Sequence, residues 1–340
     1  MRGRRAWAWV QLLGAVGILV LLVREVGAGP FLHGLRGLRP GSLLAAAAIC
    51  AVTTVCSAWR WRVVAGALGA GLRLPAATAA YYRSQFLNSV LPGGVLGDVH
   101  RGVRHGVDAG DVGRGVRAVV WERAAGQVVQ AALALLVLLA LPSPVHHAMP
   151  LILVASVAAL ALMLLAGRGA VRRGSARVRR AMRLTGAEVR TALLQRGVWP
   201  AVLLSSGLVV CGYLGTFLVA AHAAGVSGPP QRLLPAAFVV LLAASIPFNV
   251  AGWGPREGIA VWVFAAGGCG AGTGAAVATA FGVLTAAATL PGAVVLVAGW
   301  LRPRRAGPAD AEPPPALPAP RQGGIGYRRP VLPVASAESA

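Results

Sequence analysis

The sequence predicts an all-α, polytopic membrane protein with about six to eight transmembrane helices. Hydrophobic residues make up 56% of the 340 positions and charged residues make up 12%, which is about half of the roughly 25% found in soluble domains. The mean hydropathy of +0.69 leaves too little polar surface to cover a water-soluble globule. Long apolar segments complete the argument, because a helix needs about 20 mostly apolar residues to cross a bilayer.

Several segments are apolar and long enough to be expected as membrane spans. They are Trp7–Val23, Gly41–Ser57, Val116–Leu141, Ala148–Ala166, Trp199–Ala224, Leu233–Val250 and Gly274–Trp300. We expect the first to be retained rather than cleaved as part of a signal peptide, because Gly27-Ala28-Gly29 is a poor cleavage context. Two weaker segments remain: Ala76–Leu96 is interrupted by polar residues, and Ile259–Cys269 is short and rich in glycine.

The net charge of +22 comes from 32 basic residues, all of them arginine, against 10 acidic residues. These arginines lie mainly in the connections between apolar segments, which favours cytoplasmic loops over a nucleic-acid-binding face. The segment 168–196 contains nine arginines and one acidic residue, so we expect it to be cytoplasmic, like the arginine-rich N-terminus. The segments 60–83 and 101–117, with four arginines each, are interpreted as further cytoplasmic connections, and both chain termini are placed on that side.

This arrangement of arginines predicts that Ala76–Leu96 does not cross the membrane. An even number of spans must separate two cytoplasmic segments, and four clear spans already lie between the N-terminus and residue 168. The segment 76–97 is therefore expected to enter and leave on the cytoplasmic side, with a reversal at Pro92-Gly93-Gly94. Non-helical backbone at membrane depth needs protein or a wet cavity around it, so a cavity is expected here.

The second half of the chain contains a similar interruption at 247–269, where Pro247-Phe248-Asn249 precedes a glycine-rich run and a short apolar segment. This region is either two spans or a broken pair of helices that enters from the outside. Broken segments in both halves point to a transporter-type site near the membrane midplane. The membrane domain is predicted over residues 1–300, and residues 301–340 are predicted to be a disordered, proline-rich cytoplasmic tail.

Ionisable side chains within apolar segments are the candidate site residues, because burying them in a bilayer is costly. On a helix, Arg123, Gln127 and Gln130 share one face, and Asp98 can pair with Arg101 three residues later. Three clusters emerge: Arg83, Asn88, Pro92, Gly93, Gly94, Asp98 and Arg101; then Glu122 and Arg123; then Asn249, Arg256 and Glu257.

Two interpretations of these clusters stay open. The arginines can neutralise Asp98, Glu122 and Glu257 in structural ion pairs. Alternatively, arginine side chains and the N–H groups of broken helices can bind a phosphate, which makes a phospholipid or polyprenyl-phosphate headgroup the natural ligand within a bilayer.

Other chemistries lack their motifs. The sequence has no lysine for a Walker A loop and no HExxH. The histidines at positions 100, 105, 146 and 147 are interpreted as loop residues, and the four cysteines form no CxxC pair. We therefore expect no metal, no cofactor and no assigned catalytic residue.

The motifs together carry a family resemblance. The string from Arg83 through Leu91-Pro92-Gly93-Gly94 to Arg101 resembles the first signature of the lysylphosphatidylglycerol synthase transmembrane-domain family, also called flippase-like membrane proteins. Glu122-Arg123 is similar to its second signature, and the segment 247–258 is similar to its third. Their order and spacing agree, and the resemblance covers roughly Trp7 to Trp300.

The resemblance implies a multi-pass protein of the bacterial inner membrane that binds or translocates an anionic phospholipid or lipid-linked headgroup. Full-length synthases carry a separate aminoacyl-transferase domain, which has no counterpart after the last predicted span, so lysyl transfer is not expected. One alternative is an intramembrane enzyme that acts on such a headgroup with Asp98, Glu122 or Glu257 as acid or base. Another is a non-catalytic partner of a membrane glycosyltransferase.

Overall fold

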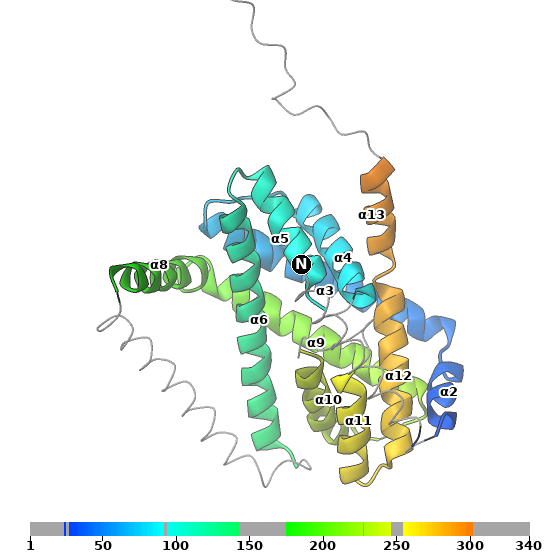
Figure 1. The fold of residues 1–340 in the computed structure, drawn as a ribbon. Coiled ribbons are helices and arrows are strands. Elements are labelled where there is room, and N and C mark those ends of the chain that lie inside the picture. The colour runs from blue at the N-terminus through cyan, green and yellow to red at the C-terminus, as the bar shows by residue number, and fades with distance from the viewer. Residues whose placement is uncertain are drawn as a thin grey trace, which may run out of the picture. The chain divides into compact units, whose positions relative to one another are not determined.

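The computed structural model describes residues 24, 27–91, 94–142, 175–226, 228–245 and 254–301, and all regular structure in these ranges is helical (Figure 1). The predicted all-α class is confirmed. The expected spans Trp7–Val23 and Ala148–Ala166 lie outside the described residues, as do Pro92, Gly93, Asn249 and the predicted tail beyond Leu301. Residues 1–300 form one unit by their contacts.

Four stretches of the described chain are long and apolar enough to cross a membrane. Three are the single helices α3 (Pro40–Ala67), α6 (Val112–Ala140) and α9 (Trp199–Ala223). The fourth, Ala271–Gly299, contains α12 (Ala271–Ala288) and most of α13 (Pro291–Leu301). Two further helices, α2 (Gly29–Arg36) and α8 (Ala176–Leu193), lie outside this set.

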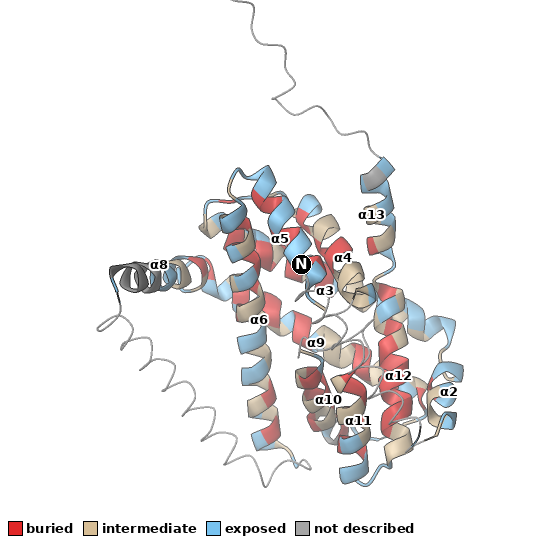
Figure 2. Ribbon diagram, viewed as in Figure 1, coloured by how far each residue is buried: buried red, intermediate tan, exposed pale blue. Residues whose placement is uncertain are grey.

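The outer faces of these helices carry side chains that suit lipid rather than water. On α6, Val120, Val128 and Leu136 are more than half exposed. Figure 2 accordingly colours parts of this helix as exposed. Inside the bundle, Phe217 of α9 packs against Phe264 and Phe281, with ring centroids 6.4 and 5.9 Å apart. The helices thus bury an apolar core while keeping an apolar exterior, as a membrane environment requires.

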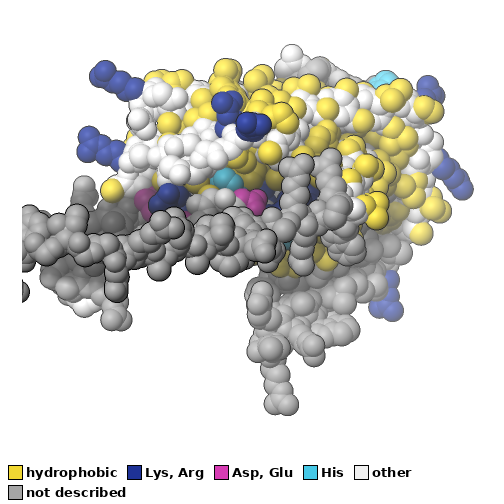
Figure 3. Space-filling view, turned by 90° about the horizontal axis from the view of Figure 1, so that it is seen from above, with side chains coloured by type: hydrophobic (Ala, Val, Ile, Leu, Met, Phe, Trp, Pro, Cys, Tyr) yellow, Lys and Arg dark blue, Asp and Glu magenta, His cyan; other side chains and the backbone are white. Residues whose placement is uncertain are grey.

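The segment predicted to be re-entrant forms a helical hairpin of α4 (Leu74–Val90) and α5 (Leu96–Asp108). Its two ends lie at the same end of the bundle: the Gly69 carbonyl accepts a hydrogen bond from Arg114 Nη1 at 3.5 Å, and His105 Nε2 lies 3.0 Å from the Ala70 carbonyl oxygen. The hairpin therefore enters and leaves where α3 ends and α6 begins. Figure 3 views the molecule from above this end, and arginine side chains project from its rim.

Two glycines make this hairpin possible. Gly94 has a φ of 61° and reverses the chain near the tip. At Gly97 a Cβ atom would lie 2.1 Å from the Ser84 carbonyl oxygen, so only glycine permits this approach of α5 to α4. The chain then continues into α6, which Asp111 caps by accepting a hydrogen bond from the Arg114 N–H at 2.9 Å. That bond holds the pKa of the Asp111 carboxyl below its ordinary value.

A second hairpin consists of α10 (Pro230–Ala244) and α11 (Pro255–Ala266), which pack against each other. The expected span Leu233–Val250 is matched only in part: α10 has 15 residues, fewer than the about 20 that a crossing needs, and residues 246–250 lie outside the described chain. Of the two alternatives for this region, the described residues match the broken pair.

The two hairpins enter the bundle from opposite ends. The first follows the end of α3, where Val64 packs with Val198 and Val202 at the start of α9. The second follows the end of α9, which packs beside Ala46 near the start of α3. In Figure 1, α4 and α5 accordingly lie in the upper part of the molecule, and α10 and α11 in the lower part. Gly94 and Gly254, one from each hairpin tip, line the same cavity.

Candidate functional site

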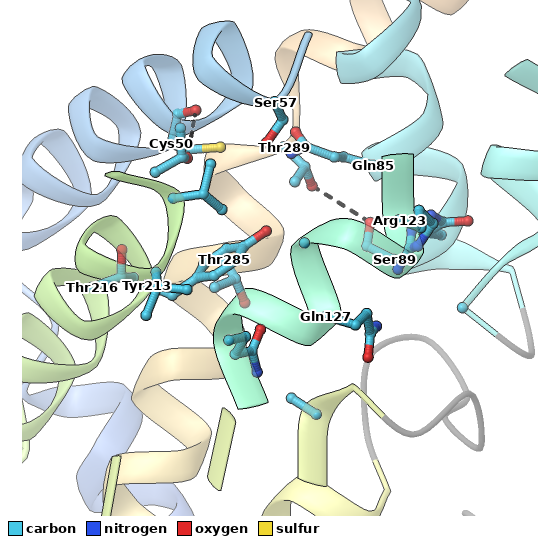
Figure 4. Close-up of a pocket in the computed structure, with 18 of the residues that line it drawn as sticks. Cys50, Ser57, Gln85, Ser89, Arg123, Gln127, Tyr213, Thr216, Thr285 and Thr289 are labelled. Atoms are coloured by element: carbon cyan, nitrogen blue, oxygen red, sulfur yellow. Dashed lines mark hydrogen bonds between the residues drawn. The ribbon is translucent and has the colours of Figure 1, made fainter. Parts of the chain in front are cut away.

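A cavity of about 320 Å³, lined by both polar and apolar side chains, lies between the two hairpin tips, and its volume is near the lower end of the range of small-molecule sites. Tyr213 extends into it from α9, and the Ser89 and Thr289 hydroxyl oxygens lie 3.4 Å apart where α4 meets the end of α12 (Figure 4). We call it the central cavity. Its polar lining includes Thr53, Ser57, Arg60, Tyr81, Gln85, Asn88, Asp98, Arg123, Gln127, Gln130, Ser206, Tyr213, Thr216, Arg256 and Thr285.

Glu122 of α6 is a densely bonded carboxylate behind this cavity, and it is fully buried. Its Oε1 atom accepts hydrogen bonds from Arg60 Nε at 2.9 Å, Arg60 Nη2 at 2.5 Å and the Tyr81 hydroxyl at 3.1 Å. Its Oε2 atom accepts one from Arg101 Nη2 at 3.1 Å. Arg60 also donates to the Ser206 hydroxyl at 2.9 Å, so this one carboxylate links α3, α4, α5, α6 and α9.

Asp98 forms the second anionic centre, at the start of α5. It pairs with Arg123 and, at 2.8 Å, with Arg101, which confirms the predicted pair three residues apart. Asn88 donates to Asp98 Oδ2 at 2.7 Å and accepts from the Gly97 N–H at 2.8 Å, so its amide holds the two arms of the hairpin together. Ser84 donates to Asp98 Oδ1 at 3.0 Å. Arg60, Asp98, Arg101, Glu122 and Arg123 together form what we call the central ion cluster.

The helix α5 carries the charges of the central ion cluster on its buried side. Asp98, Arg101 and His105 are buried, whereas Val99, Val103 and Val107 are exposed together with His100, Arg104 and Asp108. The exposed side of α5 therefore carries both apolar and charged side chains. On α6, Gly126 makes room for the cluster: a Cβ atom there would lie 3.0 Å from the Arg60 guanidinium nitrogens.

The third predicted cluster lies at the tip of the second hairpin. Arg256 and Glu257 are both buried and pair with each other at 2.5 Å. Glu257 Oε2 also accepts the Gly254 N–H at 2.6 Å, so the first turn of α11 holds its own carboxylate. The Arg256 guanidinium lies 5.3 Å from the centre of the Phe281 ring, a cation–π distance. Arg256 lines the central cavity, and Glu257 lies behind it.

The structure brings most, but not all, of the predicted site residues together. Asn88, Gly94, Asp98, Arg123 and Arg256 line the central cavity, and Arg101, Glu122 and Glu257 are buried directly behind it. The predicted polar stripe of α6 is also there, since Arg123, Gln127 and Gln130 all line the cavity. Arg83 does not: it lines a second pocket between α4 and α5.

Arg60 is the main residue that sequence reasoning missed, because it was counted among the arginines of a cytoplasmic connection. That interpretation is wrong: Arg60 lies within α3, is only 5% exposed and pairs with Glu122. A signal was present, because Thr53, Ser57 and Arg60 follow the same i, i+4, i+7 spacing that marks the stripe on α6. Tyr81, Ser206 and Tyr213 carried no comparable signal.

The charges of the central ion cluster do not balance. Three arginines face two carboxylates, and the neighbouring pair Arg256–Glu257 adds no net charge. Arg123 is the most accessible arginine of the cluster, because 39% of its side chain is exposed, against 6% for Arg60 and 0% for Arg101. Arg60 and Arg123 both line the central cavity, and the surplus positive charge of the cluster faces it mainly through the more accessible Arg123.

The backbone N–H groups at the hairpin tips contribute less than predicted. The Gly97 N–H is bonded to Asn88, and the Gly254 N–H is bonded to Glu257. These two N–H groups are thus already engaged by side chains of their own hairpins, and arginine provides the charged donors of the central cavity. No group of histidine, cysteine or acidic residues in the described ranges has the arrangement of a metal site.

The comparison with known families agrees with this geometry. A family model described as the lysylphosphatidylglycerol synthase TM region matches residues 8–292. The chain belongs to this family. The match spans both hairpins and the whole central ion cluster, and it confirms the family resemblance. No curated protein and no solved structure matches the chain. As a family member with four apolar membrane-length stretches in its described part, the protein is a multi-pass membrane protein.

Proposed function

We propose that this lysylphosphatidylglycerol synthase TM-region protein binds an anionic lipid headgroup in the central cavity and moves it across the membrane. The surplus positive charge of the central ion cluster carries the proposal. A phosphate is its natural counter-ion, because the planar guanidinium of Arg123 can donate two parallel hydrogen bonds to it. The family supports a lipid-related role, and the arginine distribution supports the bacterial inner membrane with both termini in the cytoplasm.

The two hairpins suit movement as well as binding. They enter from opposite ends and meet at one cavity, the arrangement expected of a transporter whose broken helices surround a midplane site. A headgroup that reaches the cavity from one end is contacted by α4, α5 and α6, and its release toward the other end passes α10 and α11. Access from each side then depends on one hairpin, while the central ion cluster stays in place.

The geometry disfavours the alternative of an intramembrane enzyme. Glu122 and Glu257 do not line the central cavity, and each is held by arginine. Asp98 does line it, but its two oxygens are engaged by Arg101, Arg123, Asn88 and Ser84. A carboxylate held by two arginines stays ionised and makes a poor proton donor.

The test is lipid movement in sealed proteoliposomes that contain fluorescent phosphatidylglycerol, with fluorescent phosphatidylcholine as the zwitterionic comparison. Arg123→Gln should reduce phosphatidylglycerol movement by about tenfold or more, because it removes a charge-assisted contact of about 1.5–3 kcal/mol. Arg123→Lys should also be impaired, because a point charge does not reproduce the planar fork.

The matched control is Arg114→Gln, which removes an arginine from the same helix. Arg114 is also paired with an aspartate, Asp111, and its side chain is 42% exposed, close to the 39% of Arg123. Its variant should move lipid as the wild type does. Equal rates for Arg123→Gln and Arg114→Gln would contradict the proposal, as would conversion of the lipid to a new product in detergent, which an enzyme would catalyse without a sealed membrane.

A further inference from the structure

The pocket that contains Arg83 has an unusual hydrogen-bond balance. Its volume is about 310 Å³, and it extends between α3, α4 and α5 from an exposed mouth at Gly71, Asp108 and Ala109 to a buried inner end. We call it the α4–α5 pocket. It shares none of its lining residues with the central cavity.

Every buried side-chain donor without a hydrogen-bond partner in the described part of the chain belongs to a residue of this pocket. The four atoms are Trp61 Nε1, Arg83 Nε, Arg101 Nε and Arg101 Nη1. Arg83 is only 9% exposed and forms no ion pair with a carboxylate of the described chain. All four atoms are nitrogens that donate, so the partner they require is an acceptor. Leaving a buried donor unpaired is costly, and more so when the group is charged.

The charge of the α4–α5 pocket specifies the kind of acceptor. Arg83 and Arg104 face a single carboxylate, Asp108, and the third arginine, Arg101, already has Asp98 and Glu122 as partners on its other side. A neutral acceptor would satisfy the donors but leave the surplus charge of Arg83 and Arg104. An oxyanion satisfies both requirements, and arginine favours phosphate through its planar fork.

Packing around the inner end gives the site a rigid wall. The Arg101 guanidinium lies between two aromatic rings, 4.5 Å from the centre of Trp61 and 4.1 Å from that of Tyr81. His105 packs edge-on against Trp61 at 5.2 Å, and its Nε2 atom is engaged by the Ala70 carbonyl. Arg101 is thus held in place by the central ion cluster and by these two rings, and it forms part of the lining of the α4–α5 pocket.

We infer that the α4–α5 pocket is a second anion site, separate from the central cavity, which binds a phosphate group through Arg83 and Arg104. Its mouth opens at the end of the bundle where α3 ends and α6 begins. The phosphate comes either from a phospholipid headgroup at that membrane surface or from a soluble phosphate compound. Arg101 separates the two sites, so the second site is adjacent to the first without being part of it.

The experiment measures phosphate-dependent stabilisation of the purified full chain in detergent. Inorganic phosphate and dihexanoyl phosphatidylglycerol are each titrated at constant ionic strength, with sodium chloride as the screening control. In the wild type, at least one probe should raise the melting temperature in a saturable manner. Arg83→Gln should raise the half-saturating concentration by about tenfold or more. Ala79→Phe, which keeps every charge and fills the pocket, should have a similar effect.

The matched control is Arg62→Gln, which removes an exposed arginine near the same end of the bundle without touching the α4–α5 pocket. It should bind as the wild type does. A response to phosphatidylglycerol alone assigns the phosphate to a lipid headgroup, and an equal response to inorganic phosphate assigns it to a soluble compound. The absence of saturable stabilisation by both probes would overturn the inference, as would equal effects of Arg83→Gln and Arg62→Gln.

The same titration in Arg123→Gln separates this inference from the proposed function. If the α4–α5 pocket is an independent site, the phosphate-dependent stabilisation persists in that variant even when lipid movement is lost. Loss of the stabilisation in Arg123→Gln would place the probe in the central cavity and refute a second site.

Discussion

Glu122→Gln should be the most damaging single substitution of the central ion cluster, because this carboxylate is the shared partner of two buried arginines. Glu122 is fully buried and accepts four hydrogen bonds. After the substitution Arg101 keeps Asp98, but Arg60 loses its only ion pair in the described chain while its side chain stays 6% exposed. An arginine left buried without a counter-ion costs about 3–5 kcal/mol.

The size of the effect can be converted into a melting temperature. At roughly 2–4 °C per kcal/mol for a chain of this order of length, the loss corresponds to about 6–20 °C. The assay is the apparent melting temperature in detergent at one heating rate, since thermal unfolding of such proteins is often irreversible. The control is Glu188→Gln, because Glu188 pairs with Arg117 at 2.8 Å while both side chains are partly exposed. That substitution should cost less than about 1 kcal/mol.

A double substitution tests the reasoning rather than only the result. Arg60→Gln with Glu122→Gln removes both charges of the pair, so it should recover much of the stability that Glu122→Gln loses. Equal melting temperatures for Glu122→Gln and Glu188→Gln would refute the description of Glu122 as the centre of a desolvated ion cluster. Failure of the double substitution to recover stability would show that the loss does not arise from the unpaired charge of Arg60.

Three further predictions concern topology, the tail and the first hairpin. Cysteines placed at Arg73 and Arg114, in a background without the native cysteines, should be labelled from the same, cytoplasmic side; labelling from opposite sides would exclude a re-entrant hairpin. Truncation after Arg305 should leave the protein monodisperse and active in lipid movement, and loss of membrane insertion would show that the tail contributes to folding. Gly97→Ala should lower stability by about 1–3 kcal/mol because its methyl group would lie 2.1 Å from a carbonyl oxygen of α4. The control Gly66→Ala, where a methyl group meets nothing within 4 Å, should not, and equal melting temperatures would contradict the close approach.

Much of the central cavity could be predicted because its residues stand out against an apolar background. Asp98, Arg123 and Arg256 are ionisable residues in segments that lipid or protein must surround, so each was a candidate from its type alone. The re-entrant course of 76–97 followed from the parity of spans between arginine-rich segments. Residue type and the order of segments along the chain can be read from the sequence alone, so these two predictions do not require a tertiary structure.

Arg60 and Arg83 show where that reasoning stops. Arg60 is interpreted from the sequence as a charge of a cytoplasmic connection and Arg83 as a residue of the main site. The structure instead pairs Arg60 with Glu122, 62 positions later, and places Arg83 in the α4–α5 pocket rather than in the central cavity. Which face of a helix meets which neighbour depends on how the helices rotate and cross when they pack. A periodic pattern places residues on a common face, but it does not say what that face contacts.

The sequence by itself determined the membrane class, four of the apolar spans and the two interruptions at which the chain reverses, because lipid imposes length and polarity limits that composition and order must satisfy. The tertiary structure alone decided that the hairpins enter from opposite ends, that three arginines share two carboxylates, and that Arg83 and Arg104 form a separate pocket. Each of these features depends on contacts between residues that are far apart in the chain. Such contacts form only when α3, α4, α5, α6 and α9 pack together.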